Sequence, residues 1–161
     1  MDKQTIIDNM RLIVPNLKHC KLLGIDVIDA DIGQLTLVLP YSEGIIGNPE
    51  TRVIHGGALT TLMDTACGFA AIAALTEPGI CPTLDLRIDY MGPAHPDQDV
   101  IGEAEAYRVS NNVVFARGIA YHKGKKDEPI AHCTASFMRI DASNEDKEKL
   151  SKMAANAGGK A

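Results

Sequence analysis

The sequence has no tryptophan, and aromatic residues occupy only 4% of its 161 positions. Branched aliphatic and small side chains must therefore build the core. Basic residues are also few, since 16 Lys and Arg stand against 21 Asp and Glu for a net charge of −5. Nucleic-acid binding requires a basic surface with interleaved aromatic residues, so we expect no nucleic-acid partner. The length suits one domain with a single core.

Patterns that would bind a metal ion are missing too. The five histidines contain no H-x-x-x-H or H-E-x-x-H spacing, so no metal site is expected. No C-x-x-C pair is present, which is typical of reduced thiols. A Cys67 nucleophile would need a histidine partner, and a buried structural thiol is the simpler interpretation. The N-terminus lacks a basic region followed by an apolar run, so we predict no secretory signal and a cytoplasmic location.

One stretch stands out for what it does contain. Residues 53–75 carry a single charge, Asp64, among otherwise uncharged residues. Ala, Leu and Met favour a helix here, and Pro78 and Gly79 would end it. A carboxylate near the middle makes a membrane span costly. We therefore predict a core helix buried by its own protein, and no membrane partner.

Asp64 has two interpretations, as a paired structural carboxylate or as a functional group. It lies about two turns beyond the expected helix start, too far to cap. An ionised carboxylate on a buried helix is costly unless it is hydrogen-bonded or used, and this cost favours function. At 100° per residue, small residues share its face and would let a backbone or a slender substrate approach. They are Gly57, Thr60, Thr61, Gly68 and Ala71.

The remaining pattern predicts an α+β fold. An amphipathic helix is expected over residues 2–20, disturbed near Pro15, followed by a hairpin and a loop over residues 41–52. The predicted strands are 22–31, 34–40, 81–91, 99–110, 113–123 and 130–140. One antiparallel sheet that curls around the central helix satisfies this order. The predicted divisions are an N-terminal flanking helix (1–21), one domain (22–140) and a polar tail without catalytic role (141–161).

Two segments together resemble the PaaI-like group of hot-dog thioesterases. The first is His55-Gly56-Gly57 with Asp64 seven residues after the second glycine, and the second is TLDLRIDYMGPA over residues 83–94. The resemblance covers residues 22–140. It implies a six-stranded antiparallel sheet around a long helix and a homodimer or a dimer of dimers. It also implies hydrolysis of acyl-CoA thioesters to free acid and CoA, without a metal or an organic cofactor.

The same resemblance implies roles for single residues. Asp64 falls on the catalytic acid of the family, as general base or nucleophile. Gly56 falls on the backbone N–H that polarises the thioester carbonyl, and Thr83 on a hydroxyl that orients the water. Asn48 approximates a polarising asparagine, although its spacing from His55 is one residue longer than the family's.

Thioester hydrolysis requires these kinds of group on chemical grounds alone. A base or nucleophile must act at the carbonyl carbon, and donors must hold the oxyanion. A helix N-terminus at Gly56 and Gly57 supplies free N–H groups and the positive end of the helix dipole. Without Asp64 downstream, the two glycines would be interpreted as structural. We expect His55 to orient the helix start, with its ring still within reach of the thioester.

The spacing of these groups has a consequence for assembly. Gly56 and Asp64 are eight residues apart, roughly 12 Å along a helix, whereas one carbonyl and its water must each lie within about 3 Å of donor and base. Two antiparallel helices related by a two-fold axis could bring Gly56 of one subunit to Asp64 of the other, so we expect an obligate dimer. The substrate-binding candidates are Gly57 and, for the CoA phosphates, Arg87, Arg108, Arg117 and the Lys123–Lys126 turn.

Two other functions compete with hydrolysis. A hot-dog protein could bind acyl-CoA or acyl-carrier protein without turnover, which predicts stabilisation by ligand and no product. A dehydratase or hydratase acting on 3-hydroxyacyl thioesters would pair a histidine with an acid in other sequence settings, and neither setting is present here. The acyl group does not follow from the sequence, and neither does the choice between dimer and tetramer.

Overall fold

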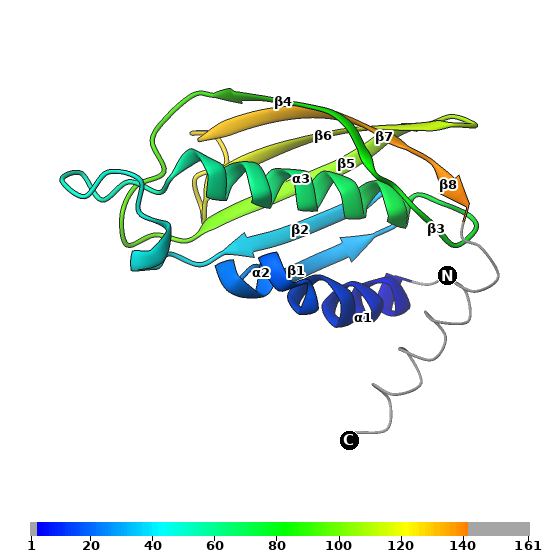
Figure 1. The fold of residues 1–161 in the computed structure, drawn as a ribbon, viewed down its shortest axis with the longest axis horizontal. Helices are drawn as coiled ribbons and strands as arrows, with labels where there is room; N and C mark the ends of the chain where they lie inside the picture. Colours follow the sequence, from blue (N-terminus) through cyan, green and yellow to red (C-terminus); the bar gives the residue numbers. More distant parts are fainter. Residues whose placement is uncertain (1–2, 142–161) are drawn as a thin grey trace, which may run out of the picture.

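The computed structural model describes residues 3–141, which form one curved antiparallel sheet with a long helix across one face (Figure 1). The six strands of the sheet are β1 (Asp26–Asp31), β2 (Gln34–Leu39), β4 (Thr83–Tyr90), β5 (Val100–Val109), β6 (Val113–His122) and β7 (Ala131–Met138). Their spatial order is β1, β2, β5, β6, β7, β4. The predicted α+β architecture is confirmed, with β1 and β4 as the two edges of the sheet. The polar tail, apart from Asp141, lies outside the described residues.

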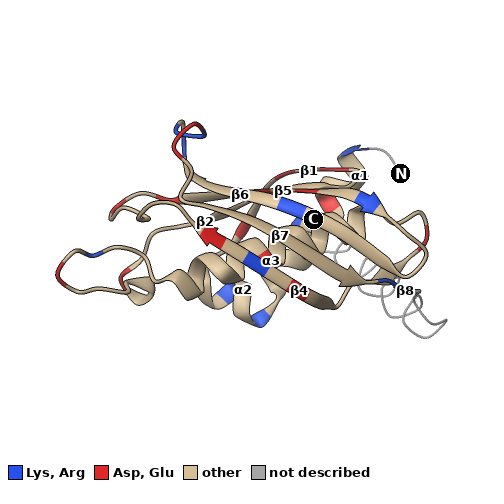
Figure 2. Cartoon of the chain, turned by 90° about the horizontal axis from the view of Figure 1, so that it is seen from above, with Lys and Arg blue, Asp and Glu red and all other residues tan. Residues whose placement is uncertain are grey.

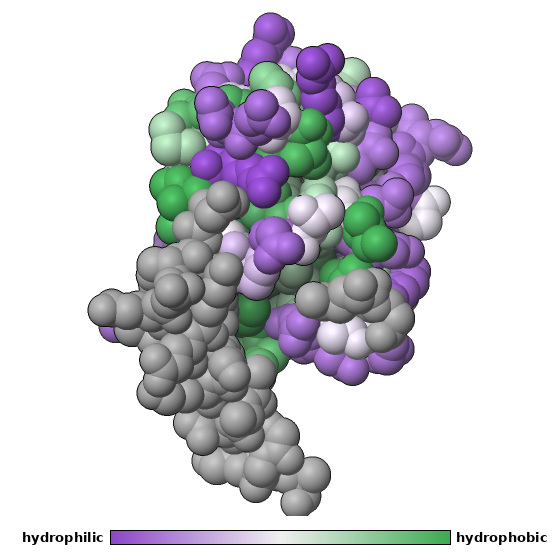
Figure 3. Space-filling view, turned by 90° about the vertical axis from the view of Figure 1, so that its right-hand side faces the viewer, coloured by the Kyte–Doolittle hydropathy of each residue, from purple (hydrophilic) through white to green (hydrophobic). Residues whose placement is uncertain are grey.

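Shorter elements frame the sheet. Before it come α1 (Lys3–Ile13), the 3-10 turn η1 (Val14–Asn16) and α2 (Lys18–Leu23), and the loop after β2 holds the turn η2 (Glu43–Ile45). A second small sheet pairs β3 (Gly79–Ile80) with β8 (Ile140–Asp141). At that end of the molecule, apolar side chains reach the surface between polar ones (Figure 3), and Ile80 of β3 is 52% exposed.

The long helix α3 (Gly56–Ala73) is the centre of the fold. It packs against β2, β5 and β6, and two glycines in the sheet let it come close. A Cβ atom on Gly118 would lie 2.6 Å from Met63 Cε, and one on Gly102 would lie 2.8 Å from Leu62 Cγ. The side of α3 that faces the sheet is fully buried, which places the hydrophobic core between helix and sheet.

The uncharged stretch begins at residue 53, but α3 begins only at Gly56, where the helix N-terminus was expected. Ile54 pairs with Ile46 in an isolated antiparallel bridge, and its N–H donates to the carbonyl of Ala94 at 3.1 Å. These contacts hold the chain extended until His55, which is the N-cap residue. The helix therefore begins at the first of the two glycines, as the sequence predicts.

The N-terminal region is not one helix, and the first predicted strand was placed too early. Pro15 lies in η1, between α1 and α2, as expected from its missing N–H and fixed φ. The second helix runs through Leu22, which the sequence analysis placed in a strand. Gly24 ends this helix with φ of +71°, and β1 begins only at Asp26.

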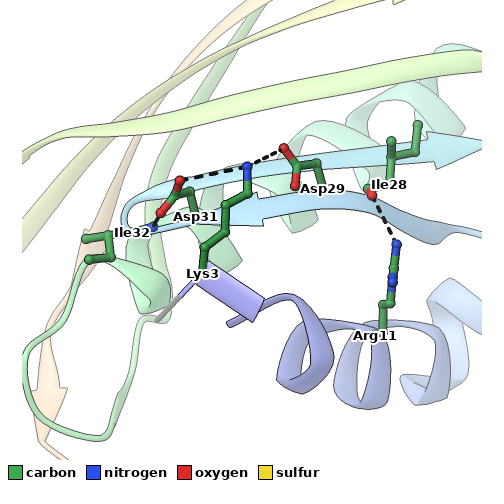
Figure 4. Close-up of polar contacts among 6 residues, drawn as sticks. All are labelled: Lys3, Arg11, Ile28, Asp29, Asp31 and Ile32. Carbon is green, nitrogen blue, oxygen red and sulfur yellow. Dashed lines mark hydrogen bonds and ion pairs between the residues drawn. The ribbon is translucent and has the colours of Figure 1, made fainter. Parts of the chain in front are cut away.

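The first helix lies against β1 at the edge of the sheet (Figures 1 and 4). Its Lys3 Nζ lies 3.0 Å from Asp29 Oδ2 and 3.8 Å from Asp31 Oδ2. Arg11 Nη2 donates to the carbonyl of Ile28 at 3.3 Å. The apolar side of α1 is buried through Ile6, Ile7 and Met10. This amphipathic pattern is the one that the spacing of apolar residues predicts.

The prediction that α3 is buried all round by its own chain is wrong. The sheet covers one side, and the face that carries Asp64 is only half-buried in a single chain. Ala71, which was predicted to share that face, is fully buried instead. The half-buried positions include Thr61, Asp64, Thr65, Gly68, Phe69 and Ile72. This face is therefore less covered within the described chain than the side that faces the sheet.

Candidate active site

His55 organises the N-terminus of α3. Its Nδ1 atom accepts a hydrogen bond from the N–H of Gly57 at 2.9 Å, and its own N–H donates to the carbonyl of Ile45 at 2.8 Å. Because Nδ1 is the acceptor, the neutral ring carries its proton on Nε2. The exposed side chain thus caps the helix and presents an N–H donor beside it.

Gly56 is the first residue of α3 and lies directly after this cap. Within residues 3–141 its N–H donates no hydrogen bond, whereas the N–H of Gly57 is taken by His55. The carbonyl of Gly56 accepts from Tyr90 Oη at 2.9 Å and from Thr60 Oγ1 at 3.1 Å. A free N–H at the positive end of a long helix is a donor for a negatively charged or polarised oxygen.

Asp64 lies two turns further along the same helix. Its Oδ1 atom accepts a hydrogen bond from Thr83 Oγ1 of β4 at 2.9 Å. The side chain of Asp64 is half-buried and that of Thr83 is exposed. Because the threonine proton is directed to the carboxylate, the threonine oxygen can still accept a hydrogen bond from water. The structure therefore brings together two of the residues that the resemblance singled out.

The same structure keeps the donor and the carboxylate of one chain apart. Gly56 and Asp64 are eight residues apart in one helix, which corresponds to about 12 Å of rise. A single carbonyl group cannot contact both.

Asn48 lies in the loop before α3 and has a local partner. Its Oδ1 atom accepts from the N–H of Glu50 at 2.8 Å and from the N–H of Thr51 at 3.4 Å. Its backbone carbonyl accepts from the N–H of Arg52 at 2.7 Å. This is a turn closed by the side chain of an asparagine, and among the described residues no hydrogen bond joins Asn48 to Gly56 or Asp64.

The basic candidates for CoA binding are scattered among acidic residues (Figure 2). Arg87 Nη2 lies 2.9 Å from Asp89 Oδ1 on the same strand, so its charge is partly satisfied. Arg117 pairs with Glu105. Arg108 is exposed on β5 and forms no ion pair with any residue from 3 to 141. Of these three arginines, Arg108 is therefore the most available to bind an anion.

The second helix supplies contacts that the sequence analysis did not foresee. His19 Nε2 lies 3.2 Å from Thr61 Oγ1, and Cys20 Sγ lies 3.8 Å from Thr65 Oγ1. Thr61 donates its proton to the carbonyl of Gly57, so His19 is the donor in the first pair. The two threonines lie on either side of Asp64 in sequence, so α2 lies beside this part of α3. In the sequence, the spacing of apolar residues in the N-terminal region was the one indication that this region packs against the domain.

Cys67 follows Asp64 by one turn and is fully buried. Its Sγ atom lies 3.4 Å from that of Cys133. This hydrogen bond and burial raise the pKa of the Cys67 thiol, and the nearby Asp64 raises it further. A thiol that stays protonated is a poor nucleophile, which agrees with the structural interpretation.

Within residues 3–141, no group of three or more His, Cys, Asp or Glu side chains could hold a metal ion. None of the described helices has the length and hydropathy needed to cross a bilayer.

A curved antiparallel sheet with one long helix across it defines the hot-dog class of folds. Comparison with known proteins gives the family: a model of the thioesterase superfamily matches residues 52–128. A Pseudomonas aeruginosa protein of known crystal structure is 54% identical, with a TM-score of 0.75 over 84% of this chain and 99% of its own. The chain belongs to the thioesterase superfamily.

More distant relatives agree with this assignment. The Escherichia coli PaaI protein of the phenylacetic acid degradation operon shares 19% identity and has the same fold, with a TM-score of 0.75 over 89% of this chain and 99% of its own. A Halobacterium salinarum protein named as an esterase is 38% identical over 58% of this chain. The medium/long-chain acyl-CoA thioesterase YigI of E. coli is 25% identical over 58% of this chain. The matches span 63% and 67% of the length of these last two proteins.

Proposed function

We propose that this protein hydrolyses acyl-CoA thioesters to the free acid and CoA. Asp64 acts as general base or nucleophile, and the N–H of Gly56 stabilises the oxyanion. The observation that carries the proposal is the pairing of Asp64 with Thr83 on the half-buried face of α3, at 2.9 Å. The name of YigI, a relative that acts on acyl-CoA, favours that class of thioester over others.

The chemistry follows from the atoms at this site. In one route Asp64 takes a proton from water while the water oxygen bonds to the carbonyl carbon, and Thr83 orients that water. In the other route the carboxylate itself bonds to the carbonyl carbon, and water then cleaves the anhydride. In both routes the carbon–sulfur bond breaks and CoA leaves as the thiol after gaining a proton. Negative charge builds on the carbonyl oxygen, where a preorganised N–H is most effective.

The proposal requires a second copy of the chain, because one helix cannot present Gly56 and Asp64 to the same carbonyl. Two features support a homodimer. The Asp64 face of α3 is only half-buried within the described chain, and β4 is an edge strand whose unpaired backbone can extend a sheet. Exposed apolar residues line β4 and the residue after it: Leu84 at 52%, Tyr90 at 52% and Met91 at 62%. A dimer about this edge would bury them.

The remaining candidates have defined places in this proposal. The ring of His55 presents Nε2–H beside the helix start and is a second donor to the thioester. Asn48 is a weaker candidate, because its carbonyl oxygen is committed to the turn and only its amide group could reach a substrate. Gly57 leaves room for the substrate, and Arg87 and Arg108 are candidates for the CoA phosphates.

The experiment is thiol release from a panel of short, long and aromatic acyl-CoAs, measured for the protein and for Asp64→Asn. We expect hydrolysis of at least one thioester, and a loss of about a hundredfold or more in kcat for the variant. Comparable melting temperatures would show that the variant is folded. A folded protein that releases no thiol from any member of the panel would overturn the proposal and favour a binding protein.

A further inference from the structure

Three oxygen atoms form a compact triangle at the start of α3. Tyr90 Oη lies 2.9 Å from the carbonyl oxygen of Gly56 and 2.9 Å from Thr60 Oγ1. Thr60 Oγ1 lies 3.1 Å from the same carbonyl oxygen. Two hydroxyl protons serve these three contacts, so two hydrogen bonds form at a time. In every arrangement of the protons, the Gly56 carbonyl accepts at least one of them.

The triangle exists because residue 56 is a glycine. A Cβ atom at this position would lie 3.2 Å from Tyr90 Oη and 3.4 Å from Cζ, so the phenol rests directly against the bare backbone. Tyr90 itself is placed by β4, where it pairs with Ala131 of β7. Glycine is the most freely rotating residue in a chain. The helix already restrains Gly56, and the two hydroxyls add to that restraint on its carbonyl.

One peptide group is held from both sides as a result. The Gly56–Gly57 peptide has its carbonyl bound by Tyr90 and Thr60, and its N–H donates to His55 Nδ1 at 2.9 Å. Hydrogen bonds in such a chain polarise one another. The chain fixes the plane of this peptide and the tautomer of His55, while the adjacent Gly56 N–H donates to no described residue.

We propose that Tyr90 is a positioning residue for the oxyanion donor, with Thr60 as its alternate. Its hydroxyl holds the Gly56–Gly57 peptide so that the Gly56 N–H and the His55 ring are already aimed when the thioester arrives. This inference rests on the proposed function, because it needs Gly56 to be the donor. Preorganised donors stabilise the transition state without reorganisation at the moment of reaction. Loss of the positioning hydroxyls should therefore lower kcat and leave KM nearly unchanged.

The test compares Tyr90→Phe, Thr60→Val and the double variant with the unchanged protein. Each single variant leaves one hydroxyl that can still donate to Gly56, so kcat should fall only about threefold. The double variant has no such hydroxyl, and its kcat should fall about a hundredfold, more than the product of the single effects. KM should stay within about twofold, because an interaction expressed only in the transition state does not weaken ground-state binding.

Tyr107→Phe is the matched control. Tyr107 is 52% exposed, as Tyr90 is, and its hydroxyl has no hydrogen bond to any residue in the described range. This variant should keep the kcat, the KM and the melting temperature of the unchanged protein. Thr60→Ser, which keeps the hydroxyl, should restore most of the kcat when it replaces Thr60→Val in the double variant.

Failure of this inference can be told apart from failure of the proposed function. If the protein hydrolyses acyl-CoA and Asp64→Asn abolishes the activity, but the double variant keeps its kcat, the positioning role is wrong and the function stands. If the protein hydrolyses nothing, both fall. Amide hydrogen exchange at Gly57 gives a readout without turnover: exchange should quicken about tenfold in the double variant, and an unchanged rate contradicts the positioning role.

Discussion

Asp64 has fewer partners than a structural carboxylate would have. It sits half-buried on a helix, and among the described residues Thr83 is its one hydrogen-bond donor, through Oδ1. A carboxylate that served only to tie α3 to β4 would have its oxygens satisfied, since unpaired buried charge is costly. Oδ2 is left to accept from water or to attack a carbonyl carbon. This arrangement suits the catalytic role that we propose for Asp64.

The role of the Thr83 hydroxyl can be tested separately from the shape of the side chain. Thr83→Val removes the donor and the water acceptor while keeping the branched side chain, so we expect kcat to fall about tenfold or more. Thr83→Ser keeps the hydroxyl and should stay within about threefold of the unchanged protein. Initial rates with the best acyl-CoA of the panel give the comparison. Equal losses in both variants would point to packing of β4 rather than to the hydroxyl.

Residue positions were predictable where they belong to a motif. The contact between Asp64 and Thr83 joins two segments that the resemblance had already singled out. Tyr90 lies inside the second of these segments, but the resemblance gave it no role, and His19 looks like an ordinary surface residue of an amphipathic helix. Their partners, Gly56 and Thr61, become visible only when strand and helix are placed in space.

At the scale of elements, the site depends on how deeply α3 sits in the sheet. Gly118 of β6 lies under Met63 of the helix, and the missing side chain makes that approach possible. Glycine in a strand is otherwise unfavourable, so the close packing must offset its cost. Met63 directly precedes Asp64, and the depth of the helix therefore sets the height of the carboxylate above the sheet.

Gly118→Ala should destabilise the fold. The new Cβ atom would lie 2.6 Å from Met63 Cε and 2.9 Å from the backbone carbonyl oxygen of Glu103, which cannot move aside cheaply. Overpacking of this kind typically costs about 1–3 kcal/mol in the free energy of unfolding. Urea denaturation measures the loss. Gly44→Ala is the control, because a Cβ atom there meets nothing within 4 Å, and a similar loss in both variants would contradict the packing argument.

The start of α3 should depend on the capping side chain. His55→Ala removes the acceptor for the Gly57 N–H, and loss of an N-cap typically costs about 1 kcal/mol. His55→Asn offers an oxygen to the same N–H and should recover most of that stability. Thermal unfolding of the two variants makes the comparison. Equal melting temperatures for His55→Ala and the unchanged protein would show that the cap is not needed.

Element types could be predicted from the sequence, whereas element boundaries could not. The alternation of Leu35, Leu37 and Leu39 identifies β2, and all three are buried as the pattern requires. Ile54 is apolar like the helix that follows, yet a bridge to Ile46 holds it extended, so the apolar run starts before the helix does. Periodicity records which side chains are apolar and says nothing of a tertiary contact that overrides it.

At the scale of the whole molecule, the open side of α3 is the main departure from the sequence prediction. An apolar helix needs a cover, and the periodicity gave no indication that the described chain would supply only one side of it. The uncovered face carries Asp64, and the edge strand β4 beside it carries Thr83. A second copy that covers this face would shield the carboxylate from bulk water, leaving room for the reacting water, and bring its own Gly56 within reach.

Mixed dimers test the shared site directly. We expect Asp64→Asn and Gly56→Pro each to be inactive as homodimers. Proline suits the backbone at the first position of a helix, and His55 before it is already extended, with φ of −65° and ψ of 134°. The Cβ atom of the proline would lie 3.2 Å from Tyr90 Oη, so a melting temperature close to that of the unchanged protein must first show that the variant is folded. If each site takes Gly56 from one chain and Asp64 from the other, the mixed dimer has one intact site and regains about half of the activity. Differently tagged chains, coexpressed and purified through both tags, give the mixed species for assay. Were both groups drawn from the same chain, every site would carry one defect and no activity would return.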